Sequence, residues 1–381
     1  MRPLASDVSR RKLVILCLLG LGANACLFGP MLLLTGDGQN DFMGMYAGAR
    51  LAFTGNMYDI HENFNVQHEA AGWENPNLLA VRLPFDALLM WPWNRLPYLQ
   101  AQHLWEIAIV LTVALFCCLW PYDRKIAALA CCWSFPLLTV FANGQDVALL
   151  LVVIALALRH MKRGSETAAG LVFSLCAVKF HLFLLVPLLV LSQKRWRFLG
   201  GLSVGAAILA VASFTVGGWN WPAQYLNLIR TPGINPAAIS MPNLHGLVYR
   251  LPHHAIWQAA GTLAVALIVW HACRKTSFEY GIAAAMTGGV LVAPHDYLAD
   301  CALVLPALLL TLPMAAEKWR RYFYLFLLSP LSSIWGGNYH TWITTLSLLA
   351  LLIFLGKLND QHFPNAIGVR FDKFESFADI G

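Results

Sequence analysis

The chain has 381 residues, of which 58% are hydrophobic and only 12% are charged. Soluble domains carry about 25% charged residues, so this composition excludes an ordinary soluble domain and indicates a membrane protein. The formal net charge of +6 does not indicate a nucleic-acid partner. The basic residues stand between apolar segments, where they determine membrane topology.

Apolar segments close to the roughly 20 residues that a membrane helix needs recur along the whole chain. The first, 13–34, is too long for a signal peptide and lacks a small-residue cleavage site, so we predict a retained membrane anchor. The other predicted segments are 101–120, 125–141, 146–160, 167–192, 198–217, 254–273, 279–293, 298–314, 321–335 and 340–357.

Segment 167–192 contains "AVKFH", in which Lys179 and His181 interrupt an apolar run. A charge in the middle of a bilayer costs several kcal/mol, so these side chains should face protein or water. We therefore expect two shorter helices that enter the membrane and return to the same side. This division places all Lys and Arg on one side except Arg50, Arg82, Arg95, Lys179, Arg230 and Arg250. The bias predicts about a dozen membrane helices with both termini in the cytoplasm.

Chemically active side chains collect on the opposite, extracytoplasmic side. Nine of the twelve histidines lie there or near that edge, as do ten acidic residues: Asp37, Asp41, Asp59, Glu62, Glu69, Glu74, Asp86, Asp146, Asp296 and Asp300. Channels and pumps usually place ionisable residues within their spans. In this chain the histidines and acidic residues instead converge on one face, which favours an enzyme that acts on a lipid-linked substrate. The nine cysteines lie in or beside apolar segments without CxxC spacing, which is typical of small buried hydrophobes.

The stretch 41–54 has helical spacing, with Phe42, Met45, Tyr46 and Ala49 on one side. This pattern predicts an amphipathic helix at the outer interface, with Asp41 at its N-terminus. An aspartate at this position is either a helix cap or a functional carboxylate, and the pattern leaves both interpretations open.

Several stretches together resemble glycosyltransferase family 87, whose members are polytopic enzymes of the GT-C fold. They are "DFMGMYAGARLAFTGNMYD" (41–59), "LPFDALLMWPWNRLP" (83–97), the segment from "NGQDVALL" through "AVKFH" to "QKRWR" (143–197), "NLHGLVYRL" (243–251) and "APHDYL" (293–298). Family members often have Tyr-Pro-Pro where this chain has Arg82-Leu83-Pro84.

The resemblance implies an all-α GT-C domain over 1–360, followed by a cytoplasmic tail at 361–381. About 12 membrane helices and an outer interfacial helix are expected, with large outer loops at 35–100 and 218–254. The implied activity is inverting transfer of a sugar, often mannose, from a polyprenyl-phosphate donor to a lipid or glycan acceptor. The active site would face outward from the cell membrane, surrounded by membrane lipids, and would need no cofactor and no metal.

The resemblance also assigns roles to individual residues. Asp41 stands at the position of the catalytic base, and an acceptor hydroxyl needs such a carboxylate to take its proton. Lys179, His181 and His295 are candidates to face the donor phosphate, where negative charge gathers as the bond breaks. Further candidates for substrate binding are Asp37, Tyr46, Arg82, Asn143, Gln145, Asp296 and His340.

Other interpretations stay open at this point. Lys179 alternatively extends from a helix end to the interface, and His295 is alternatively an ordinary loop residue. Asn143 and Gln145 are expected mainly to form a hydrogen-bonded reversal between two spans. "HDYLAD" (295–300) allows a divalent cation without matching a strong motif. A flippase or transporter, a polymerase or ligase of lipid-linked glycans, and a non-catalytic scaffold are the alternative functions.

Overall fold

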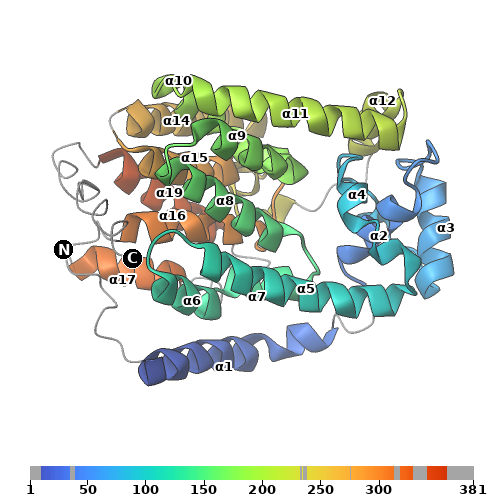
Figure 1. The fold of residues 1–381 in the computed structure, drawn as a ribbon, viewed down its shortest axis with the longest axis horizontal. Helices are drawn as coiled ribbons and strands as arrows, with labels where there is room; N and C mark the ends of the chain where they lie inside the picture. The colour runs from blue at the N-terminus through green and yellow to red at the C-terminus, as the bar shows by residue number, and fades with distance from the viewer. Residues whose placement is uncertain are drawn as a thin grey trace, which may run out of the picture.

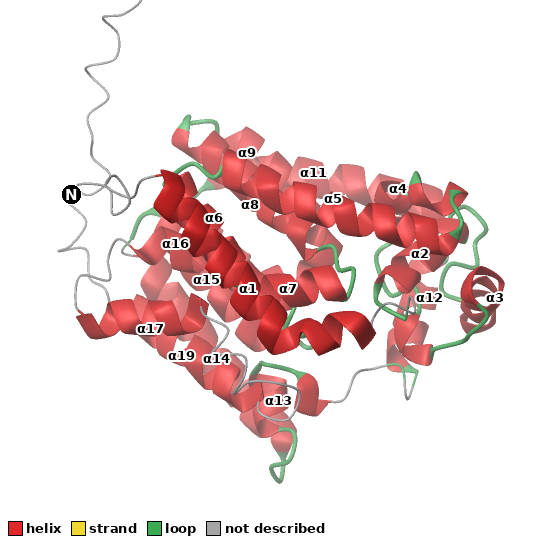
Figure 2. Ribbon diagram, turned by 90° about the horizontal axis from the view of Figure 1, so that it is seen from below, coloured by secondary structure: helices red, strands yellow, loops and turns green. Residues whose placement is uncertain are grey.

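A computed structural model describes residues 10–34, 39–231, 234, 238–274, 276–312, 318–328 and 341–357. Within these ranges every regular element is an α-helix or a 3₁₀-helix, and the helices pack side by side (Figures 1 and 2). This confirms the predicted all-α fold class for the described part of the chain.

The elements of the first half begin with the long helix α1 and end with the pair α9 and η3. They are α1 (Arg10–Leu34), α2 (Phe42–Arg50), α3 (Ile60–Ala71), η1 (Pro76–Leu78), α4 (Asp86–Met90), η2 (Trp93–Arg95), α5 (Tyr98–Leu119), α6 (Arg124–Trp133), α7 (Phe135–Ala142), α8 (Val147–Lys162), α9 (Glu166–Phe173) and η3 (Ser174–Phe183).

The second half contains further apolar helices and short connecting turns. They are α10 (Val186–Ser192), α11 (Trp196–Gly217), α12 (Trp221–Arg230), η4 (Ala238–Ser240), α13 (Leu244–Val248), α14 (His254–Arg274), α15 (Phe278–Val292), η5 (Asp300–Leu303), α16 (Val304–Thr311), α17 (Lys318–Leu328) and α19 (Thr341–Lys357).

Four helical stretches of the described residues are long and apolar enough to cross a membrane: α5, α9 with η3, α11 and α14. A fifth is formed if α6 and α7, bent by 66° at their junction, count as one span. These helices identify the chain as a membrane protein by length and composition. The figure of about 12 membrane helices stays a prediction.

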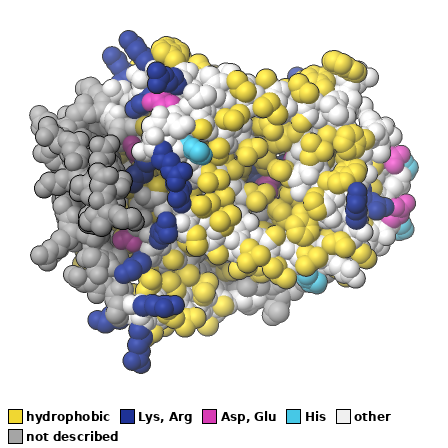
Figure 3. Space-filling view, in the orientation of Figure 1, with side chains coloured by type: hydrophobic (Ala, Val, Ile, Leu, Met, Phe, Trp, Pro, Cys, Tyr) yellow, Lys and Arg dark blue, Asp and Glu magenta, His cyan; other side chains and the backbone are white. Residues whose placement is uncertain are grey.

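The surface is divided into zones along the long axis of the molecule. In Figure 3 most Lys and Arg side chains gather at one end, hydrophobic side chains cover the middle, and acidic and histidine side chains with a smaller basic patch appear at the opposite end. Helices α2, α3, α4 and α12 lie at that opposite end (Figure 1). A wide apolar band between polar ends is the surface expected of a protein surrounded by lipid.

The segment predicted to divide at "AVKFH" does so. Lys179 has non-helical backbone angles, φ −126° and ψ 53°, between helical stretches on either side. The two ends of the segment meet, because Arg195 Nη1 lies 2.5 Å from Glu166 Oε1. The chain therefore runs inward, turns near Lys179 and returns to its starting end.

Helix α2 differs from the predicted interfacial helix. It ends at Arg50, and all residues from Phe42 to Ala49 are buried. The prediction of a helix with one lipid-facing side is therefore wrong for this element. The reason is compositional: "FMGMYAGA" has no polar face, and a helix that is apolar all round is buried in protein.

Candidate functional site

Asp41 immediately precedes α2 without capping it. The Asn40 side chain takes the capping role, since its Oδ1 accepts the Phe42 N–H at 3.1 Å, while Asp41 forms no side-chain cap. The Asp41 N–H donates to the Asn143 carbonyl at 3.0 Å. The carboxylate is thus available for another purpose, and the capping interpretation of Asp41 is wrong.

The Asp41 carboxylate points to a glutamine that is distant in sequence. Gln145 Nε2 donates to Asp41 Oδ2 at 2.5 Å, and Gln145 Oε1 accepts from Lys179 Nζ at 2.6 Å. For the other carboxylate oxygen, Oδ1, the described residues provide no hydrogen-bond partner. A base needs such an oxygen to receive a proton.

Carboxylates bind the two buried cations, Lys179 and Arg82, next to the contact between Asp41 and Gln145. The Lys179 ammonium contacts Asp300 Oδ1 and lies 3.5 Å from Asp146 Oδ1. Arg82 Nη2 donates to the same Asp146 oxygen at 3.1 Å. Lys179 is buried with three oxygen partners, whereas only one Arg82 nitrogen has a partner among the described residues. Buried charges require such pairing, so the cluster is a built polar centre.

All of these side chains except Asp146 line one cavity of about 80 Å³. Its polar lining consists of Asp41, Asn77, Arg82, Gln145, Lys179, His181, His295, Tyr297 and Asp300. The His181 and His295 rings are 6.0 Å apart between centroids, and His295 packs edge-on against Tyr297 at 5.0 Å. Five separate parts of the sequence therefore meet at one opening.

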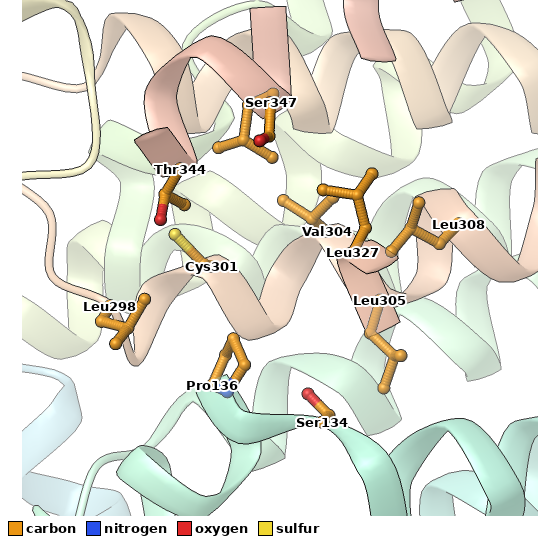
Figure 4. Close-up of a pocket in the computed structure, with 11 residues that line it drawn as sticks. Ser134, Pro136, Leu298, Cys301, Val304, Leu305, Leu308, Leu327, Thr344 and Ser347 are labelled. Carbon is orange, nitrogen blue, oxygen red and sulfur yellow. The ribbon is translucent and has the colours of Figure 1, made fainter. Parts of the chain in front are cut away.

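A second cavity, of about 40 Å³, lies between α7, η5, α16, α17 and α19. Figure 4 shows its lining, mostly leucine and valine with the hydroxyls of Ser134, Thr344 and Ser347 and the thiol of Cys301. It contains no acid–base pair and no cation among the described residues. The polar cavity at Asp41 is therefore the candidate site.

The surroundings determine the protonation of the groups at the opening. Burial raises the pKa of the Asp41 carboxyl above its usual range, while the Gln145 hydrogen bond and the charges of Lys179 and Arg82 oppose the rise. Burial lowers the pKa of His295 to about 4, so this imidazole is neutral at pH 7. A neutral ring donates a hydrogen bond without carrying a charge.

The structure gathers some of the predicted site residues and separates others. Asp41, Arg82, Gln145, Lys179, His181 and His295 share the cavity. Tyr46 is buried and donates to the Leu96 carbonyl at 3.0 Å, Asn143 contributes its carbonyl, and Asp296 is fully buried. None of these three lines the cavity. Asp37 and His340 lie outside the described residues.

Sequence reasoning placed Asp146 and Asp300 on the outer side but did not assign them to the site with Lys179. Both are buried and pair with Lys179. The available signal was that a buried lysine requires carboxylate partners. In the described part of the chain no group of three or more His, Cys, Asp or Glu side chains could hold a metal ion.

Comparison with known proteins gives one clear match. The model of glycosyltransferase family 87 matches residues 84–294, which is more than half of the chain. No curated protein and no solved structure matches the chain. The matched region carries Gln145, Lys179 and His181 of the polar cavity, whereas Asp41, Asn77, Arg82, His295, Tyr297 and Asp300 lie outside it. The chain therefore belongs to glycosyltransferase family 87 and is a membrane glycosyltransferase.

Proposed function

We propose that the protein is an inverting glycosyltransferase that uses a polyprenyl-phosphate sugar, mannose being the expected sugar, at the extracytoplasmic face of the cell membrane. The acceptor is a lipid or glycan hydroxyl, and Asp41 is the base. The observation that carries this proposal is a carboxylate relieved of capping and held at the opening of a cavity that also contains Arg82 and His295.

The chemistry needs one base and one leaving group. The acceptor oxygen forms a bond to the anomeric carbon as its proton passes to Asp41. The bond between that carbon and the phosphate oxygen breaks, and its electron pair leaves with the polyprenyl phosphate. Inversion follows because a single displacement attacks from the face opposite the leaving group. No second carboxylate nucleophile is required.

The departing phosphate gains negative charge, so donors should face it. Arg82 is the best placed cation, because its one hydrogen bond to the described residues is made by Nη2, which leaves Nε and Nη1 for a ligand. His295 and His181 add hydrogen-bond donors on the same cavity. Lys179 donates to Gln145 and Asp300 and lies 3.5 Å from Asp146, which supports an organising role rather than direct phosphate contact.

The position of the site supports a donor held in the membrane. The cavity is lined in part by residues of α2 and η1, and α2 lies at the end of the molecule opposite the main basic cluster (Figures 1 and 3). A lipid-linked phosphate would enter it there from the bilayer. A flippase has no need of a base beside unpaired donors, so the arrangement favours transfer over transport.

The test uses the purified protein in proteoliposomes with membrane lipid extract as acceptor. Labelled polyprenyl-phosphate sugars and nucleotide sugars are supplied in parallel. We expect transfer only from the polyprenyl-phosphate donor, with inversion of the anomeric centre. Transfer from nucleotide sugars alone would overturn the donor assignment.

The same assay tests the base. Asp41→Asn should reduce transfer on the order of 100-fold or more with donor binding preserved. Asp59→Asn is the matched control, because Asp59 is an exposed cap whose side chain accepts the Glu62 N–H. Asn caps nearly as well as Asp, so the control should stay close to wild type. Equal activities of the two variants would remove Asp41 as the base.

A further inference from the structure

The loop between α7 and α8 fixes the chain around Asp41. The Asn143 carbonyl of this loop accepts a hydrogen bond from the Asp41 N–H, and the Gly144 carbonyl accepts one from the Trp105 indole at 2.7 Å. Gly144 has φ +62°, and a Cβ there would approach Phe42 Cβ to 3.0 Å. A left-handed backbone in close contact with α2 requires glycine. The residue after it, Gln145, is therefore placed against Asp41 by a rigid turn.

The orientation of the Gln145 amide follows from its two partners. The Lys179 ammonium can only donate, so the amide oxygen must face it, at 2.6 Å. The amide nitrogen then faces Asp41 Oδ2 at 2.5 Å. Gln145 is 3% exposed, so water does not compete strongly for either contact. Lys179 thus determines which group of Gln145 is offered to Asp41.

We propose that Gln145 is a positioning residue, which holds Oδ2 of Asp41 and leaves Oδ1 facing the cavity for the acceptor's proton. This inference rests on the proposed role of Asp41 as the base. Lys179 acts on the base through Gln145, and Asp300 and Asp146 hold Lys179 in turn. The arrangement explains why a lysine that lines the cavity directs its hydrogen bonds to Gln145 and Asp300.

The same contact affects the proton affinity of Asp41. A donor to the ionised carboxylate favours that form, so removing the donor should raise the pKa of Asp41. Several titratable groups also face Asp41 or share its cavity: Lys179, Arg82, Asp300, Tyr297, His181 and His295. None of these groups is itself substituted when Gln145 alone is changed, and in Gln145→Met the oxygen partners left to Lys179 are those of Asp300 and Asp146.

The experiment compares Gln145→Met and Gln145→Glu with wild type in the polyprenyl-phosphate-sugar assay from pH 5 to 9. Met keeps the approximate shape without hydrogen bonds, and Glu keeps the shape but adds a like charge. We expect kcat to fall about 10- to 100-fold near neutral pH with little change in donor KM. The acidic limb of the kcat–pH profile should move to higher pH, and it should move further for Glu than for Met. The loss of kcat relative to wild type should therefore become smaller as pH rises.

Gln193→Met is the matched control, because this amide also donates to backbone carbonyls in partly buried surroundings, those of Cys273, Thr276 and Ser277, away from the cavity. It should leave the acidic limb unchanged. An unchanged limb in both Gln145 variants, or a loss expressed only in KM, would overturn the inference. If Gln145→Met fails to fold, the isosteric Glu variant decides.

The two proposals fail differently. Inactive Asp41→Asn with normal Gln145 variants would leave the base in place and remove the positioning role. Active Asp41→Asn would remove the base itself, whatever Gln145 does.

Discussion

Arg195 and Glu166 form an ion pair of 2.5 Å although 29 residues separate them in sequence. The pair joins the two ends of the segment that turns at Lys179. Both side chains are partly exposed, so the pair contributes at most about 1 kcal/mol to stability. Its value is geometric, because it shows that the basic residues on either side of the segment lie at one end of the molecule.

Accessibility labelling should reflect this arrangement. In a cysteine-free variant, Lys162→Cys and Trp196→Cys are both exposed and should react with an impermeant maleimide only after the membrane is opened. Asn65→Cys, on the exposed side of α3, should react in intact cells. Labelling of positions 162 and 196 from opposite sides would contradict the hairpin.

The packing of α9 against α11 gives a stability prediction. A Cβ on Gly201 would lie 1.9 Å from the Thr167 carbonyl oxygen, so Gly201→Ala must push the helices apart. Overpacking of this kind costs about 1–3 kcal/mol or more, and the melting temperature in detergent should fall. Gly200→Ala is the control, since nothing lies within 4 Å of its Cβ. Similar melting temperatures would show that the contact is looser than described.

Removing the buried lysine should harm folding as well as activity. Lys179→Met leaves Asp146 and Asp300 without their shared cation, which costs about 3–5 kcal/mol. Adding Asp300→Asn to Lys179→Met should restore part of the melting temperature but not the transfer rate. Full stability in the single variant would show that the carboxylates find other partners.

How far the sequence leads differs from one residue to the next. The break at Lys179 was predictable, because a charge in an apolar run must find a polar partner. The contact between Asp41 and Gln145 was not, since 104 residues separate them and no local pattern links two loops. Asp146 and Asp300 stand at helix starts, where an acid resembles an ordinary cap. The apolar composition of α2 indicated a buried helix. The helical spacing of its apolar residues led instead to the prediction of an amphipathic interfacial helix.

Arg82 offers a test of the donor end. Arg82→Leu should raise the KM for the polyprenyl-phosphate sugar about 10-fold or more, because a guanidinium donates two hydrogen bonds to a phosphate. Arg82→Lys should recover only part of this, since an ammonium binds as a point charge. Arg95→Leu removes an exposed arginine of the same loop away from the cavity and is the control. Unchanged KM in Arg82→Leu would assign the phosphate to the histidines.

His295 gives a prediction in pH. Burial lowers the pKa of His295 to about 4, so the ring is neutral across the working range and acts through hydrogen bonds, not through a charge. His295→Gln keeps a donor and should retain activity within about 10-fold, whereas His295→Leu should lose about 100-fold. The wild-type transfer rate should not fall as pH is raised from 6 to 7.5, because His295 does not lose a proton in that range.

Stability provides an independent check on the same residue. The unfolded chain binds a proton at His295 near its ordinary pKa of about 6.5, but the folded chain does so only near 4. Between these values the unfolded state holds more protons, so the free energy of unfolding falls as pH drops from about 6.5 towards 4. His295→Gln lacks this group and should lose less melting temperature over that interval. A steeper loss of melting temperature in His295→Gln would contradict this account. So would a transfer rate that declines near pH 6.5 in the wild type but stays level in His295→Gln, because the charged ring would then be the functional form.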